Sequence, residues 1–119
     1  RDWPQDLGNV GRPVTLIQVT GGSSRRAMRG RGLWAAGAFG VRAITQAAAL
    51  ELRGRGIHVA LLIVDAGIEP LTGGRPGADP ATLADPHAIA RAVQLLGEQG
   101  ARAATHEQQV TPLGERWVP

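Results

Sequence analysis

The sequence predicts an α/β domain with about three parallel strands flanked by helices. Residues 57–64 are almost continuously apolar, which is typical of a strand buried on both faces of a sheet. Residues 14–20 form a β-branched run of strand length, and residues 33–53, between these two runs, are rich in helix formers. A strand, a helix and a second strand in this order form a βαβ unit, in which the strands are parallel and the crossover is right-handed.

The first predicted helix is apolar around nearly its whole circumference. Only a narrow polar strip remains, through Arg42, Gln46 and Arg53. A helix that is apolar on two faces must be covered on two sides. We therefore expect one face on the sheet and the other on a second helix or subunit. Gly54 and Gly56 are expected to end this helix, because glycine tolerates the positive φ that helix C-termini often need.

A second helix is predicted to start at Asp85 and Pro86, because a carboxylate suits the N-cap and proline suits the first helical position. It should run to about Glu98 and stop near Gly100. Residues 105–111 are a candidate for a strand at the sheet edge. The helix residues expected to face the sheet are Ile89, Ala92, Val93 and Leu96.

The connecting segments are rich in glycine, proline and arginine. Residues 1–13 predict a loop or a frayed helix end, and residues 21–32 a long loop. Residues 65–84 lack periodicity, and a loop of that length is usually a lid, a binding loop or disordered. At the end of the chain, Trp117 and Val118 are expected to dock on a surface.

The composition fits one folded domain of 119 residues and excludes several classes of function. The pI of 11.3 accompanies a net charge of only +3, because all thirteen basic residues are arginine and no side chain titrates between histidine and arginine. Nucleic acid is therefore not an expected partner. The lack of cysteine excludes disulfides, thiolate catalysis and cysteine-ligated metals. No long apolar run or signal-peptide pattern is present, which favours a cytoplasmic protein without a membrane segment.

The loop after the first strand contains two patterns that suggest anion binding. The GGSS segment has neither the lysine nor the spacing of a phosphate-binding P-loop, so a plain turn is expected. The loop arginines could bind phosphate or RNA, but no aromatic residues are interleaved with them for base stacking. A solvated face or a subunit contact is therefore expected for Arg25, Arg26, Arg29 and Arg31.

The three histidines do not have the spacing of a zinc site, and no cysteine could complete one. His58 lies in a predicted strand and is expected to be a satisfied, partly buried residue. Ser24, Asp65 and His106 could be arranged as a hydrolase triad, but no GxSxG elbow supports that arrangement.

Taken together, VTLIQVTGG, LWAAGAFGVRAITQAAALELRGRGIHVALLIV and DPHAIARAVQLL resemble the C-terminal half of the short-chain dehydrogenase/reductase family. The resemblance spans most of residues 14–110, is firmest across ALELRGRGIHV, and extends to ATHEQQVTP as the last strand. It implies a partial Rossmann-type three-layer sandwich and an oxidoreductase that uses NAD or NADP. In the family, the first half of the chain carries the glycine-rich turn that binds the dinucleotide. Residues 1–13 contain no such turn, so the main cofactor-binding half is expected to be absent from this chain.

The resemblance also implies that the family's reactive residues are replaced. Aligned on AITQAAALEL, the family's tyrosine falls on Trp34 and its lysine on Ala38, and Thr20 or Gly21 takes the place of its serine. The chain contains no tyrosine or lysine, and an indole cannot exchange a proton near neutral pH. Ile68 corresponds to a residue that contacts the nicotinamide carboxamide in the family. Thr20, Gly21, Trp34, Ala38 and Ile68 are therefore the candidate cofactor-binding residues, and no catalytic residue is expected.

Two features of the first helix leave alternatives open. Trp34 is either a gate that stacks on a ligand ring or a large core residue, and the core interpretation is favoured because buried aromatics usually pack. Gly37 and Gly40 give a cofactor close access to the backbone, or they permit a close helix contact; the sequence does not favour either.

The leading functional hypothesis is an atypical, catalytically incompetent relative of short-chain dehydrogenases that retains nucleotide or small-molecule binding. The alternative is a non-enzymatic oligomerisation module that uses the helix of residues 33–53 as its interface and binds no cofactor. The sheet order is expected to follow the chain, which leaves the first strand at an exposed edge. We therefore expect a homo-oligomer, a dimer or a tetramer, or a separate N-terminal half that covers this edge.

Overall fold

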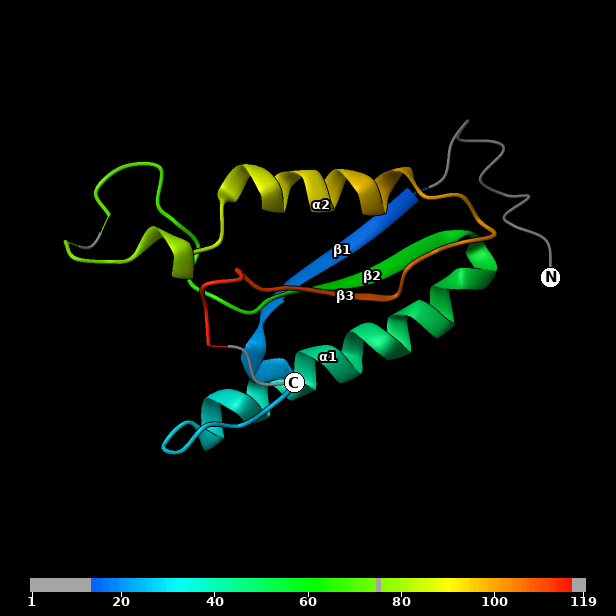
Figure 1. The fold of residues 1–119 in the computed structure, drawn as a ribbon. Coiled ribbons are helices and arrows are strands. Elements are labelled where there is room, and N and C mark those ends of the chain that lie inside the picture. The colour runs from blue at the N-terminus through cyan, green and yellow to red at the C-terminus, as the bar shows by residue number, and fades with distance from the viewer. Residues whose placement is uncertain (1–13, 75, 117–119) are drawn as a thin grey trace.

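The computed structural model describes residues 14–74 and 76–116, and it confirms the predicted α/β architecture. Three parallel strands form one sheet in the order β1-β2-β3. In Figure 1, helix α1 (Gly32–Leu52) lies on one face of the sheet and helix α2 (Pro86–Glu98) on the other. Short 3₁₀ turns occupy Gly22–Ser24, Arg53–Arg55 and Pro80–Thr82. The strands are β1 (Val14–Gly21), β2 (Ile57–Val64) and β3 (Glu107–Val110).

Strand β2 is the buried centre of the sheet. It pairs with β1 along its whole length, from Val14 opposite Ile57 to Gly21 opposite Val64. Strand β3 pairs with the second half of β2, and every residue of β2 after Ile57 is buried. This burial confirms the prediction from its continuous apolar run. The other side of β1 pairs with no strand in the described part of the chain.

The face of the sheet under α2 holds the hydrophobic core. Ala60, Leu62 and Val64 of β2 cluster with Ala84 and the fully buried Leu96. The partly buried α2 residues Ile89, Ala92 and Val93 pack against this cluster, as the helix period predicted.

Helix α2 starts as its sequence predicts. Asp85 is the N-cap, and its carboxylate accepts a hydrogen bond from the backbone N–H of His87 at 2.9 Å, with Pro86 in the first helical position. The helix ends at Glu98, just before the predicted stop at Gly100.

Helix α1 turns its polar strip toward the sheet. Arg42 donates two hydrogen bonds of 2.8 Å to the Glu107 carboxylate of β3, and Gln46 donates a third at 3.2 Å. Ala35 and Thr45 are the buried residues of the same helix face. The expectation of one face on the sheet is therefore confirmed, and Arg42 and Gln46 mark that face.

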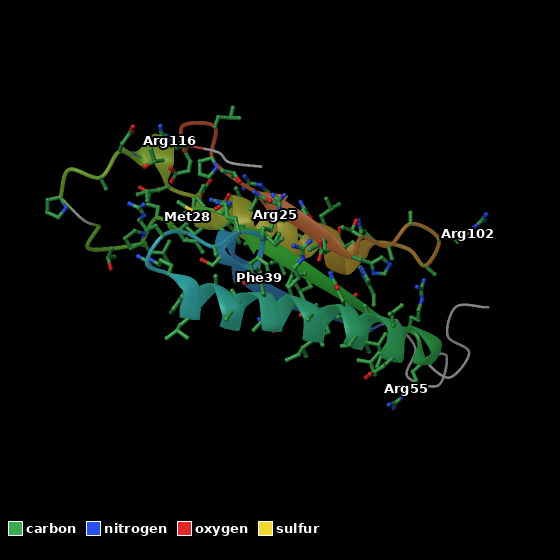
Figure 2. All side chains as sticks on the ribbon, turned by 90° about the horizontal axis from the view of Figure 1, so that it is seen from below. Arg25, Met28, Phe39, Arg55, Arg102 and Arg116 are labelled. Atoms are coloured by element: carbon green, nitrogen blue, oxygen red, sulfur yellow. The ribbon has the colours of Figure 1, made fainter. Side chains whose placement is uncertain are left out.

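The opposite face of α1 is apolar and projects away from the sheet (Figure 2). Leu33 is 93% exposed, Ile44 70% and Leu50 69%. Trp34, expected in the core, is 67% exposed, so the core interpretation is wrong for this chain. The reason is positional: Trp34 lies about 80° around the helix from Arg42, outside the stripe that faces the sheet.

The element boundaries differ from the predictions by a few residues. Helix α1 covers Gly32–Leu52 instead of residues 33–53, and a 3₁₀ turn continues it to Gly56, whose φ of 79° closes the turn. Strand β3 keeps only four residues of the predicted 105–111. The loop of residues 65–84 contains a 3₁₀ turn and a bridge between Ile68 and Ala84.

Residues 1–13 and the predicted docking of Trp117 and Val118 lie outside the described residues. Within the described residues, no helix is both long and apolar enough to cross a membrane.

Candidate site at the carboxyl edge of the sheet

The three strands end at one edge of the sheet, where open parallel sheets place their ligand sites. β1 ends at Gly21, β2 at Val64 and β3 at Val110. The backbone N–H of Asp65 donates to the Val110 carbonyl at 2.9 Å, which ties the end of β2 to the end of β3. Asp65 is thus the first residue beyond the central strand, and it is buried.

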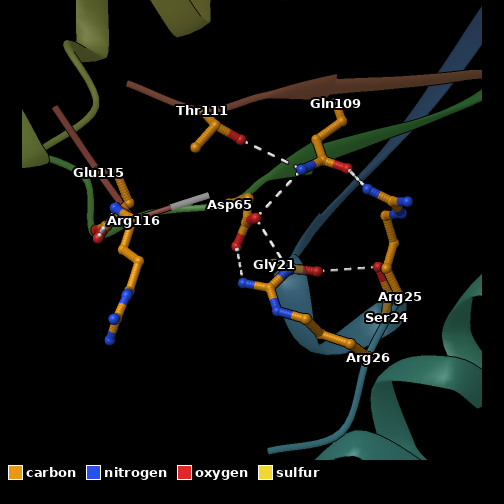
Figure 3. Close-up of polar contacts among 9 residues, drawn as sticks. All are labelled: Gly21, Ser24, Arg25, Arg26, Asp65, Gln109, Thr111, Glu115 and Arg116. Atoms are coloured by element: carbon orange, nitrogen blue, oxygen red, sulfur yellow. Dashed lines mark hydrogen bonds and ion pairs between the residues drawn. The ribbon is translucent and has the colours of Figure 1, made fainter. Parts of the chain in front are cut away.

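The Asp65 carboxylate is the centre of a polar network (Figure 3). Arg26 donates to both carboxylate oxygens at 3.0 Å, and Gln109 Nε2 donates to Oδ2 at 3.1 Å. Arg25 donates to Gln109 Oε1, and Gln109 Nε2 also lies 3.2 Å from the Thr111 hydroxyl. The loop after β1 is therefore fixed to the ends of β2 and β3, through five side chains that come from distant parts of the sequence.

Gly22 makes this network possible. A Cβ atom on Gly22 would lie 2.1 Å from Asp65 Oδ1 and 2.8 Å from Asp65 Cγ. The buried Ser24 completes the turn, since its hydroxyl donates to the Gly21 carbonyl at 2.9 Å. The GGSS segment is thus a turn, as expected, and its second glycine leaves room for the carboxylate.

The loop arginines divide into two pairs, and the expectation of a solvated face or a subunit contact is wrong for Arg25 and Arg26. Arg25 and Arg26 turn inward to the network, whereas Arg29 and Arg31 are exposed. The hydrogen bonds to Asp65 raise the pKa of Arg26 above its ordinary value, so this guanidinium stays charged. Sequence reasoning missed Gln109 and Thr111, and it considered Asp65 as a member of a hydrolase triad. No sequence signal links Gln109 to Asp65 or to Arg25, because these contacts span 44 and 84 positions.

The predicted cofactor-binding residues come from three different parts of the fold at the same end of the sheet. Thr20 and Gly21 are the last residues of β1, and Trp34 and Ala38 lie in the first two turns of α1. Ile68 is 47% exposed and lines a cavity of about 530 Å³ that the loop of residues 67–83 forms by itself.

The other candidate sites are not assembled. His106 lies at the amino end of β3, and its ring is 6.2 Å from that of His58. Ser24 and Asp65 lie at the opposite, carboxyl edge of the sheet, so these three residues do not form a hydrolase triad. His58 is buried and donates from Nε2 to the Thr105 carbonyl at 2.7 Å, which confirms it as a satisfied residue. Within residues 14–74 and 76–116, no cluster of three metal-ligating side chains exists.

Comparison with solved structures supports a relationship to short-chain dehydrogenases. The crystal structure of a short-chain dehydrogenase from Rhodopseudomonas palustris matches with a TM-score of 0.66 and 29% sequence identity. The match covers 89% of this chain but 42% of that chain, so this chain spans less than half the length of the enzyme it matches. No protein-family model matches the sequence, and a search of curated proteins found no match. The chain therefore has a partial Rossmann-like α/β fold of the short-chain dehydrogenase type.

Proposed function

We propose that this chain is the C-terminal half of a short-chain-dehydrogenase-like fold that no longer performs the family's hydride transfer. One observation carries the proposal: the chain contains no tyrosine and no lysine. The resemblance around AITQAAALEL puts Trp34 and Ala38 at the positions of the family's tyrosine and lysine. An indole N–H donates a hydrogen bond but does not exchange a proton near neutral pH. A methyl group at position 38 cannot lower the pKa of a neighbouring acid.

The polar network at the carboxyl edge supports this proposal. Arg26 uses both terminal nitrogens on Asp65, and Gln109 is shared between Asp65, Thr111 and Arg25. The hydrogen-bonding groups nearest to the strand ends are thus occupied in holding the loop. This arrangement fixes the loop, and it engages the Asp65 carboxylate, the acidic group of the network, with Arg26 and Gln109.

We propose that the carboxyl edge of the sheet still binds a nucleotide or another small molecule, although hydride transfer is lost. The indole of Trp34 is 67% exposed in the first turn of α1, where an aromatic ring can stack on it. Thr20 and Gly21 end the neighbouring strand, and Ile68 follows β2. NAD or NADP is the cofactor class that the family relationship suggests. The open edge of β1 is where a separate N-terminal half would complete the site.

Fluorescence titration tests the binding proposal directly. The chain is titrated with NAD⁺, NADH, NADP⁺ and NADPH, and the Trp34→Phe variant is titrated in parallel, since Trp3 and Trp117 remain in both proteins. We expect saturable quenching in the wild-type chain that is lost in the variant. Equal responses of the two proteins would contradict a site at Trp34. Turnover of NAD(P)H with a panel of aldehydes and ketones would overturn the loss of hydride transfer.

A second function, assembly without a cofactor, is favoured by the exposed apolar surface. Among the described residues, nine hydrophobic residues are buried while fourteen large ones are exposed. The exposed group includes Leu16 and Val19 of the open edge strand and most of the outer face of α1. Surfaces of this kind mark protein contacts. Native mass spectrometry should find a multiple of 12.4 kDa or a larger companion; a dispersed monomer at about micromolar concentration would refute the assembly function.

A further inference from the structure

A cavity of about 560 Å³ opens at the amino end of the sheet, opposite the carboxyl edge. It lies between the C-terminal end of α1, the start of β2 and the loop that leads from α2 into β3. Figure 1 shows this loop and the end of α1 side by side at that edge. None of the candidate cofactor-binding residues lines the cavity, so it is separate from the proposed nucleotide site.

The wall of this cavity is rich in basic and imidazole groups. Arg53, Arg102, His58 and His106 line it, against the single carboxylate of Glu51. In the part of the chain that the structure describes, neither of these arginines forms an ion pair. A guanidinium group binds the oxygens of a carboxylate or a phosphate through two parallel hydrogen bonds. The charge of the wall therefore suits an anionic group.

The place where the β2–β3 ladder ends adds a backbone donor to this wall. In a strand, the N–H groups of alternate residues point to the same edge, and that of Leu61 donates to the His106 carbonyl at 2.8 Å on the β3 side. The N–H of Val59, two residues earlier, therefore points to that side as well. Val59 lines the cavity and is 2% exposed, yet none of residues 101–106 accepts a hydrogen bond from its N–H. A buried N–H normally has a partner, and a ligand oxygen in the cavity would supply it.

The loop opposite Val59 is held in place by side chains. Gln99 Oε1 accepts from the Thr105 N–H at 2.9 Å, and Gln99 Nε2 donates to the Thr105 hydroxyl at 2.7 Å. His58 Nε2 donates to the Thr105 carbonyl at 2.7 Å, and the ring of His106 stands edge-on to the His58 ring. The cavity is thus formed before any ligand arrives, which lowers the entropic cost of binding.

We propose that this cavity binds a small organic anion, a carboxylate or a phosphate monoester with an apolar body. Arg53 and Arg102 bind the charged oxygens, and the Val59 N–H donates to one of them. The apolar body packs on Leu50 and Ile57, which also line the cavity. The volume lies within the range of small-molecule pockets, about 300–1,000 Å³. This site goes beyond the proposed function, since it lies at the other end of the sheet from the nucleotide site.

A titration followed in proton–nitrogen correlation NMR spectra tests the site. The probes are phenyl phosphate and phenylacetate, together with inorganic phosphate and acetate, which lack the apolar body. We expect saturable shifts of the Val59 amide signal, with a Kd for phenyl phosphate below about 1 mM and at least about fivefold below that for inorganic phosphate. A Val59 signal that does not shift at about 10 mM of any probe would overturn the proposal.

Matched variants distinguish this cavity from general attraction by surface charge. Arg53→Gln and Arg102→Gln should each weaken phenyl phosphate binding by about five- to twentyfold. Arg55→Gln is the control, because Arg55 is exposed at the same end of the molecule as Arg102 (Figure 2) but does not line the cavity. Equal weakening by Arg53→Gln and Arg55→Gln would overturn the proposal.

Filling the cavity tests its location. Ala104 lines the cavity and is half-buried, so Ala104→Leu should abolish phenyl phosphate binding while the helix signal in circular dichroism stays unchanged. Undiminished binding in this variant would overturn the assigned location. The quenching of Trp34 by nucleotides is read separately in the same variants and should not change, so failure of either proposal is recognised by itself.

Discussion

Replacing Gly22 with alanine should break the polar network at the carboxyl edge. The new methyl group would stand 2.1 Å from Asp65 Oδ1 and 3.2 Å from Arg26 Nη1, well inside van der Waals contact. The loop or the carboxylate must move, and the two hydrogen bonds between Arg26 and Asp65 cannot both survive. Asp65 is fixed on a strand end, so the displacement falls on the ion pair.

The size of the effect follows from the burial of the pair. The side chains of Arg26 and Asp65 are 23% and 10% exposed, between a surface ion pair and a buried one. Surface pairs contribute up to about 1 kcal/mol, whereas breaking a buried pair costs about 3–5 kcal/mol. We therefore expect Gly22→Ala to lower the free energy of unfolding by about 2–3 kcal/mol.

Urea denaturation at one fixed protein concentration measures this loss without interference from association. The matched control is Gly21→Ala, because a Cβ on Gly21 would make only an ordinary contact, 3.8 Å from the Val64 carbonyl oxygen, with φ of −103°. The control should change stability by less than about 0.5 kcal/mol. Equal effects of the two substitutions would refute the reasoning. So would an undiminished effect of Gly22→Ala in a chain that already carries Asp65→Ala, since the clash with the carboxylate is then gone.

Three further predictions concern the packing of the two helices. The hydrogen bonds from Arg42 lower the pKa of Glu107 below its ordinary value of 4.5. The ionised carboxylate therefore stabilises the folded chain above pH 4.5, and this stabilisation is lost as the pH falls through the lowered pKa. Glu107→Gln should remove this pH dependence from the free energy of unfolding, a change of at most about 1 kcal/mol. Asp85→Ala removes the N-cap of α2 and should cost about 1 kcal/mol in urea, whereas Asp85→Asn should cost little. Leu96→Ala should cost about 2–4 kcal/mol by thermal or urea unfolding because Leu96 is fully buried, while Leu95→Ala, at 56% exposure, should be nearly neutral; similar losses would contradict the assigned core face.

Local patterns in the sequence were sufficient to predict the α/β architecture. The apolar run of residues 57–64 predicted the buried central strand, and Asp85 with Pro86 predicted the start of α2. The 3.6-residue period identified the face of α2 that packs on the sheet. These predictions succeeded because each depends on neighbours within a few positions of the chain. The order of the strands, expected together with the family resemblance, is the order observed.

The carboxyl edge could be predicted only in part. The resemblance located Thr20, Trp34 and Ile68 near this end of the fold, but it gave no reason to connect Asp65 with Gln109. The distribution of apolar residues showed that the first helix is apolar on two faces. The general tendency of aromatic side chains to pack in cores led to the wrong expectation that Trp34 is buried. The sequence pattern did not predict which of the two helix faces packs on the sheet.

The sequence alone therefore determined the elements, their order and the absence of the family's tyrosine and lysine, because these depend on residue types and short spacings. Only the tertiary structure decided that Arg26 and Gln109 meet at Asp65, and that Gly22 is required there. It also decided that Arg42 turns toward Glu107 on β3, which leaves Leu33 and Ile44 on the outside. The physical reason is the same in each case: ion pairs and hydrogen bonds between distant segments form only after the sheet has brought those segments together.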